Sequence, residues 1–133
     1  MACLFPAPAA ATVRYSISLS DRSAGRFHVR MEVPAVDGSL EVDMPVWNAL
    51  YQVRDFASRI EGLHAQLPTG AAVPLRRLTP HSWRAGALPG AAKGTVVLEY
   101  FITWDEPGPF SSELNVDHAF LNLATVLLYV PDR

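Results

Sequence analysis

The sequence predicts an all-β fold, an antiparallel β-sandwich of about eight strands with at most one short helical segment. Apolar and polar residues alternate in three successive segments, which is the period of a half-buried strand. Turn signals rich in glycine, proline and aspartate recur about every ten residues, as they do in sandwiches. No long stretch has the 3.6-residue period of an amphipathic helix. The 133 residues are enough for one domain.

The first three strands follow directly from this alternation. Every second residue from 13 to 20 is apolar, and residues 27–33 repeat the pattern after an Asp-Arg-Ser-Ala-Gly turn at positions 21–25. These two segments are therefore predicted to form a hairpin. A third strand is predicted over residues 40–46, and it ends at Trp47. Each strand has one apolar face, which predicts a sheet with one side on a core and the other in water.

The middle of the chain carries two conflicting patterns. Apolar residues recur at helical spacing through residues 51–63, whereas they alternate from 61 to 67. The pattern alone does not decide between helix and strand. We expect a turn or short helical segment around residues 53–57 and then a strand from about 59 to 67, because a solitary helix would interrupt an otherwise all-strand order.

The remaining strands are bounded by prolines and glycines. Residues 73–78 and 82–87 predict two short strands, and Pro74 favours an edge position for the first of them. Residues 95–104 are the longest run of β-branched and aromatic residues, with two apolar faces, and this predicts a central strand. The last strand is predicted over residues 125–130.

Composition excludes several classes of function. Eleven basic and 13 acidic residues give a formal net charge of −2, without the cationic excess that a phosphate backbone or an anionic membrane attracts. Cys3 is the single cysteine, so an internal disulfide framework and a cysteine-based zinc cage are excluded. No apolar run reaches the roughly 20 residues of a membrane span. We interpret residues 1–12 as a flexible leader and residues 13–133 as a single domain.

No catalytic residue and no metal ligand is predicted. The sequence contains neither His-Glu-x-x-His nor Gly-x-Ser-x-Gly, the motifs of zinc hydrolases and of serine hydrolases. Glu41 and Asp43 lie on one face of a strand, as solvated faces commonly allow, and nothing apolar surrounds them to separate their pKa values. The four histidines lie on separate segments: His28, His64, His81 and His118.

One segment is unusually rich in the residue types of binding hot spots. Trp, Tyr and Arg gather at the end of the third predicted strand, between residues 45 and 59. The alternative is that these aromatics fold back over the open end of the sandwich, and the two interpretations are compatible if part of the segment faces outwards. The candidate interface residues are Trp47, Asn48, Tyr51, Arg54, Asp55 and Phe56.

This segment resembles the N-terminal domain of the glycyl aminopeptidase family, zinc metallopeptidases with a thermolysin-like catalytic domain and a PDZ domain. The resemblance is carried by Pro45-Val46-Trp47, by Tyr51 and by the run from Val53 to Ala57. The family's Pro-Gly turn is replaced here by the shorter Asn48-Ala49-Leu50, which puts a function of that loop in doubt. Further similarities follow in order over the rest of the chain: Tyr15, Trp83, residues 96–100, 119–122 and 128–130.

The resemblance implies a non-catalytic β-sandwich domain that packs on the catalytic domain of the same parent protein and helps to shape its substrate cleft. The family's zinc motif belongs to that next domain, so no cofactor is expected in this chain. An exposed apolar patch is expected near Trp47 and Tyr51, where the other domain would dock. The alternative function is a stand-alone binding module for peptide or carbohydrate. The compartment, cytoplasmic or periplasmic in a bacterium, stays open.

Overall fold

The computed structural model describes residues 12–47, 52–90, 93–131 and 133. These residues form an all-β fold in which every strand pair is antiparallel, which confirms the predicted fold class. The elements among them, in chain order, are β1 (Arg14–Asp21), β2 (Arg26–Val36), β3 (Ser39–Asp43), the 3-10 turn η1 (Ala57–Arg59), β4 (Ile60–Gln66), β5 (Ala72–Val73), β6 (Leu75–Thr79), β7 (Ser82–Gly86), β8 (Gly94–Thr103), β9 (Glu113–Leu114), β10 (Ala119–Phe120) and the 3-10 turn η2 (Leu123–Thr125).

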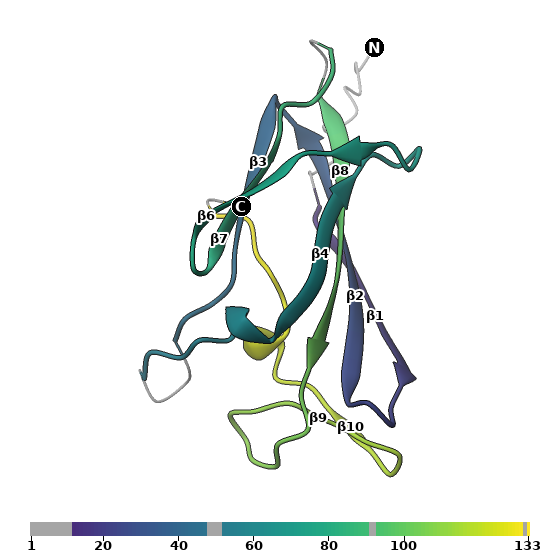
Figure 1. Cartoon of the computed structure of the whole chain (residues 1–133), viewed down its shortest axis with the longest axis vertical. Coiled ribbons are helices and arrows are strands. Elements are labelled where there is room, and N and C mark those ends of the chain that lie inside the picture. Colours follow the sequence, from purple (N-terminus) through teal and green to yellow (C-terminus); the bar gives the residue numbers. More distant parts are fainter. Residues whose placement is uncertain (1–11, 48–51, 91–92, 132) are drawn as a thin grey trace, which may run out of the picture.

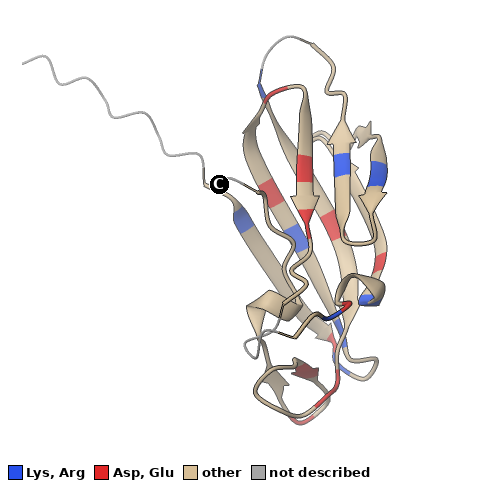
Figure 2. Cartoon of the chain, turned by 90° about the vertical axis from the view of Figure 1, so that its left-hand side faces the viewer, with Lys and Arg blue, Asp and Glu red and all other residues tan. Residues whose placement is uncertain are grey.

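Two sheets form the layers of the sandwich. The larger sheet has the order β1-β2-β8-β4-β5 and the smaller one the order β3-β7-β6, while β9 and β10 make a separate short hairpin. Figure 1 shows the long strands of the larger sheet side by side, with β3, β6 and β7 on the left and the β9–β10 hairpin at the bottom. Figure 2 looks at the molecule from that left-hand side, with the smaller sheet in front of the larger one.

The core lies between the layers and is built by the alternation that the sequence displays. Phe27, Val29, Met31 and Val33 of β2 are 0% exposed, and the facing residues of β8 are equally buried. Strand β8 pairs with β2 on one side and with β4 on the other, which confirms its predicted central position. The smaller sheet closes the core with apolar side chains that include Leu40, Val42, Trp83 and Ala85.

The conflict in the middle of the chain is resolved in favour of a strand. The helical part is only the 3-10 turn Ala57–Arg59, and β4 then runs over Ile60–Gln66. The predicted short helical segment therefore exists but begins about four residues later than expected. A bulge between Glu61 and His64 shifts the register of β4 against β8, and the left-handed φ of +65° at Gly62 lies inside it.

The predicted strand at residues 73–78 is divided between the two sheets. Strand β5 pairs with β4 in the larger sheet, and β6 pairs with β7 in the smaller one. Pro74 lies between them, and its carbonyl accepts a hydrogen bond from Gly86 N at 2.9 Å. Proline has no N–H to donate to a ladder, so the chain changes sheets at this residue. Both strands lie at sheet edges, as the proline predicts.

The prediction of a strand at residues 125–130 is wrong. Residues 123–125 form a 3-10 turn, and the following segment pairs with a strand only at the isolated bridge between Asp43 and Tyr129. Its backbone groups bind aromatic side chains instead. Tyr100 Oη donates to Val126 O at 2.7 Å and accepts from Leu128 N at 3.0 Å. The apolar residues that predicted a strand are present, but in the described chain this segment has no ladder of backbone hydrogen bonds to a neighbouring strand.

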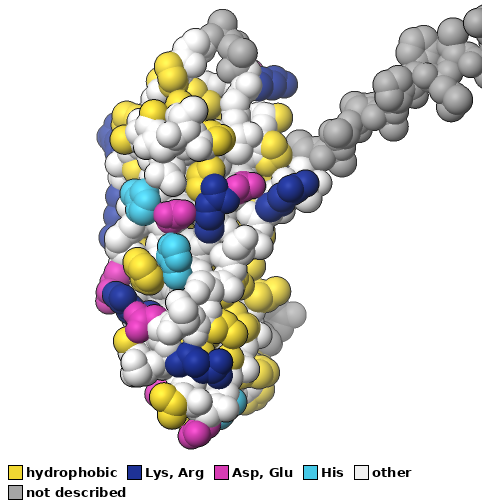
Figure 3. All heavy atoms as spheres, turned by 90° about the vertical axis from the view of Figure 1, so that its right-hand side faces the viewer, with side chains coloured by type: hydrophobic (Ala, Val, Ile, Leu, Met, Phe, Trp, Pro, Cys, Tyr) yellow, Lys and Arg dark blue, Asp and Glu magenta, His cyan; other side chains and the backbone are white. Residues whose placement is uncertain are grey.

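The outer face of the larger sheet is polar and charged. Arg30 forms ion pairs with Glu32 and with Glu99, and His64 Nε2 lies 3.5 Å from Glu99 Oε2. Figure 3 shows charged and histidine side chains in a band across the middle of the side that lies on the right in Figure 1. This face is solvated, as predicted for a sheet with one buried side.

Candidate functional site

The structure places the predicted interface residues in different environments. Trp47, Arg54 and Asp55 are exposed, whereas Phe56 is buried. Asn48 and Tyr51 lie outside the described residues, so the predicted patch is described only on the Trp47 side. There the indole of Trp47 is 55% exposed and the side chain of Val53 is 69% exposed.

A short backbone pairing positions these residues. Trp47 and Val53 form an isolated antiparallel bridge, and Arg54 N donates to Val46 O at 2.7 Å. Asp55 lies just before the 3-10 turn Ala57–Arg59, and its carboxylate accepts a hydrogen bond from Ser58 N at 3.2 Å. The side chain of Asp55 thus serves the local fold, while that of Arg54 extends from the paired segment.

Phe56 belongs to the core and not to the free surface. Its side chain is 5% exposed, and its ring centroid lies 5.9 Å from that of Trp104 with the planes tilted by 58°. This geometry is an ordinary tilted aromatic contact. Of the predicted interface residues, Phe56 thus folds back over the end of the sandwich, as the alternative interpretation of this segment expects, while its neighbours Arg54 and Asp55 face outwards.

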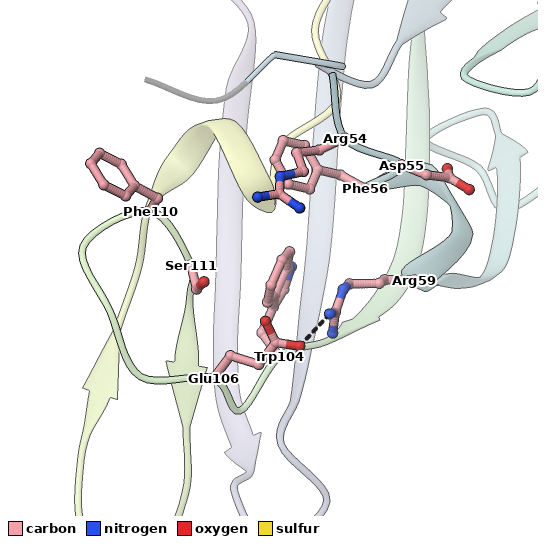
Figure 4. A pocket seen from close by; sticks show the side chains of 8 residues that line it. All are labelled: Arg54, Asp55, Phe56, Arg59, Trp104, Glu106, Phe110 and Ser111. Atoms are coloured by element: carbon pink, nitrogen blue, oxygen red, sulfur yellow. Dashed lines mark hydrogen bonds and ion pairs between the residues drawn. The ribbon is translucent and has the colours of Figure 1, made fainter. Parts of the chain in front are cut away.

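The segment borders a hollow of about 210 Å³ at this end of the sandwich. Figure 4 shows Arg54 and Phe56 on one side of it, Trp104 at its centre and Phe110 opposite. Asp55 points away from the hollow in the same view. The residues that line the hollow are Arg54, Asp55, Phe56, Arg59, Trp104, Glu106, Phe110 and Ser111.

Arg59, Trp104 and Glu106 form one connected wall of the hollow. The Arg59 guanidinium carbon lies 3.7 Å from the centroid of the Trp104 ring, within the range of a cation–π contact. Arg59 Nη2 donates to Glu106 Oε1 at 2.5 Å, and Nη1 donates to Thr103 O at 3.2 Å. Trp104 is held in turn by a bond from Nε1 to Thr125 O at 2.9 Å. The charge of Arg59 is thus neutralised within the domain.

Sequence reasoning missed this second wall. Arg59 and Glu106 are 47 residues apart, and no local pattern relates them. Trp104 is the last residue of the strand predicted at residues 95–104, and Glu106 follows it in the chain. The proximity of both to Arg54 depends on the register of β4 against β8, which pairs Ile60 with Ile102.

A second hollow of about 350 Å³ lies on the other side of Arg54 and Asp55. It is lined mainly by apolar groups, which come from Val46, Val53, Ala57 and Pro80, with His81 at the rim. Val53 lines this hollow, and both Val53 and its bridge partner Trp47 are exposed. Together they form an apolar surface, which we call the Trp47 surface, defined by Trp47, Val53, Val46 and Pro80.

A metal site requires several side chains that together hold the ion. Among the described residues, no group of three or more histidine, cysteine, aspartate or glutamate side chains lies close enough to hold a metal ion. The short 3-10 turns of the described chain also lack the length and apolar character of a membrane span.

The fold and the site define a two-sheet β-sandwich domain with open hollows at one end. The sequence matches the Peptidase M61 N-terminal domain family over residues 14–133, and the chain belongs to this family. This match confirms the resemblance to a peptidase N-terminal domain that the sequence shows. No curated protein matches the sequence.

A solved structure shares the fold. The chain is similar to an aminopeptidase N family protein from Idiomarina loihiensis, with a TM-score of 0.80 and 24% sequence identity. The similarity covers 91% of this chain and 20% of that protein. The chain therefore spans about a fifth of the length of that structure.

Proposed function

We propose that this chain is the non-catalytic N-terminal domain of a zinc metallopeptidase, and that it packs through the Trp47 surface on the catalytic domain of the same polypeptide. In that position it would form part of the wall of the substrate cleft. Zinc and the residues that bind it would belong to the catalytic domain.

The observation that carries the proposal is the exposure of Trp47 and Val53 beside an apolar hollow. Trp47 is 55% exposed and Val53 is 69% exposed. A partner that covers both side chains removes apolar surface from water, and this removal favours association. The family supports a partner within the same polypeptide, because its members are N-terminal domains of peptidases.

The test measures association between this chain and the separately produced peptidase part of its gene product. Val53→Ser removes an exposed apolar side chain from the Trp47 surface, and Val116→Ser is its matched control. Val116 is 72% exposed in the connection between β9 and β10. We expect Val53→Ser to weaken the complex about tenfold, the effect of about 1.5 kcal/mol of lost apolar burial. Val116→Ser should leave the dissociation constant within about twofold.

Three outcomes contradict the proposal. The first is the absence of a complex between the two wild-type parts in analytical ultracentrifugation. The second is an equal effect of the two valine substitutions. The third is chelator-sensitive hydrolysis of a glycyl amide by this chain alone, which would make the domain catalytic. Binding of an oligosaccharide or free peptide that depends on Trp47, without a complex with the peptidase part, would instead support a stand-alone binding module.

A further inference from the structure

Arg54 carries a positive charge that the described part of the domain does not neutralise. Its Nη2 donates to Gln52 Oε1 at 2.7 Å, and this amide oxygen bears no net charge. The other arginine of the same hollow, Arg59, is already paired with Glu106. Four arginines of the described residues have carboxylate partners within 4.0 Å: Arg26, Arg30, Arg59 and Arg84. Arg54 is not among them.

Asp55 does not compensate this charge. Its carboxylate accepts from Ser58 N, and its carbonyl oxygen accepts from Ser58 Oγ at 2.9 Å. Figure 4 shows the carboxylate turned away from the hollow into which the Arg54 guanidinium reaches. The hollow thus contains one paired and one unpaired guanidinium group, and it favours an anion.

The size of the hollow selects the kind of anion. Pockets for small molecules usually have volumes of about 300–1,000 Å³, whereas this hollow has about 210 Å³. It is suited to one side chain of a protein partner rather than to a metabolite. The aromatic side chains of Phe56, Trp104 and Phe110 are among the residues that line it, and a partner that fills the hollow would exclude water and so strengthen a charge interaction there.

The guanidinium geometry favours a carboxylate. The planar fork of arginine matches the two oxygens of a carboxylate in a bidentate pair, which a lysine ammonium cannot form. Arg59 already makes an arginine–carboxylate contact in this hollow, through a single hydrogen bond from Nη2 to Glu106 Oε1. The hollow also adjoins the Trp47 surface, because Arg54 and Asp55 border both hollows.

We infer that Arg54 is the electrostatic anchor of the domain interface, and that it binds the carboxylate of an aspartate or glutamate side chain which the catalytic domain inserts into this hollow. This inference rests on the proposed function, because it names the contact that the peptidase part makes. Arg59 is a positioning residue: it holds Trp104 and Glu106 as one wall of the hollow and does not itself bind the partner.

The experiment measures the dissociation constant between this chain and the peptidase part of its gene product for three arginine variants. Arg54→Glu reverses the charge in the hollow, and we expect it to weaken binding about 100-fold, as for a buried interfacial ion pair that is replaced by a repulsion. Arg54→Lys keeps the charge but loses the bidentate geometry, and we expect a loss of about tenfold. The control is Arg76→Glu, which makes the same charge change on an exposed residue of β6 that lines neither hollow. It should change binding by less than about threefold.

Two further measurements complete the test. The thermal unfolding midpoint of Arg54→Glu should equal that of the wild type, because the side chain is exposed and contacts no core residue through a hydrogen bond. Reversing the acidic residue on the peptidase part to arginine should restore binding to Arg54→Glu and not to Arg76→Glu.

The outcomes separate this inference from the proposed function. If the wild-type parts bind and Arg54→Glu binds as well as Arg76→Glu, the inference is overturned while the proposed function stands. If the wild-type parts do not bind, the proposed function fails and the inference fails with it. If Arg54→Glu alone loses binding and a charge reversal on the partner restores it, the anchor is established.

Discussion

Removing the hydroxyl of Tyr100 should strongly destabilise the domain, although the substitution Tyr100→Phe deletes a single atom. The side chain is 1% exposed. Its Oη donates to Val126 O at 2.7 Å and accepts from Leu128 N at 3.0 Å. Val126 and Leu128 are both 0% exposed, so water cannot easily take over these bonds. One oxygen atom therefore satisfies two buried backbone groups of a segment that has no strand ladder of its own.

The magnitude follows from the number of groups left without a partner. A buried backbone donor or acceptor that loses its partner costs about 1–3 kcal/mol. Two such groups predict a loss of about 2–6 kcal/mol for Tyr100→Phe, a large part of the stability of about 5–15 kcal/mol that domains usually have.

Tyr15→Phe is the matched control. Tyr15 Oη donates to Leu128 O at 2.8 Å, so it binds the same segment through a single bond. Its side chain is 37% exposed, and water can replace the lost donor. We therefore expect a loss of only about 0.5–1.5 kcal/mol for this substitution.

Urea unfolding followed by tryptophan fluorescence measures both changes. Native-state hydrogen exchange adds a local readout, because the amide of Leu128 should exchange faster in Tyr100→Phe than in the wild type. A Tyr100→Phe variant that loses no more stability than Tyr15→Phe would show that the hydroxyl does not hold the segment. Unchanged exchange at Leu128 would lead to the same conclusion.

Two further predictions concern stability. Burial raises the pKa of Tyr100 well above its usual value of 10, so the unfolded chain loses this proton at a lower pH than the folded chain. The free energy of unfolding should therefore fall as the pH rises above about 10. In alkaline urea titrations, Tyr100→Phe should reduce this fall. Gly86→Ala should cost more than Gly62→Ala in the same assay. Both glycines have a positive φ, but a Cβ on Gly86 would lie 2.7 Å from the Cβ of Ser39, whereas none lies within 4 Å at Gly62. We expect the two losses in the free energy of unfolding to differ by about 1–3 kcal/mol. Equal losses would show that the backbone near Ser39 can move away from the added Cβ at little cost.

The strands whose positions were predicted correctly are those whose burial can be read from their own residue types. β2 alternates four fully buried residues with polar ones, and β8 is apolar on both faces because it has neighbours on both sides. Such burial appears in the residue types themselves, since a face that contacts a core selects apolar side chains. The break at Pro74 was partly predictable for the same reason, because the missing N–H is a property of the residue.

The candidate site was predicted only along one segment. The cluster of Trp47, Arg54 and Asp55 was visible because hot-spot residue types occur close together in the chain. The hollow beside Arg54 was not visible, because its other wall comes from Trp104 and from the turn that follows β8. The orientation of Phe56 was also undetermined, since an aromatic at the end of a strand fits either the core or a partner.

The sequence by itself determined the fold class, the central strand, the turns and the segment that carries the proposed interface. These features depend on which residues prefer burial and which prefer a turn, and both preferences are local. Tertiary structure alone decided that the last segment is held by Tyr100 and Tyr15 rather than by a ladder. It also decided that Arg59 is neutralised by Glu106 while the side chain of Arg54 donates to the uncharged Gln52. Both outcomes depend on contacts between residues far apart in the chain, and the local alternation of side chains contains no information about them.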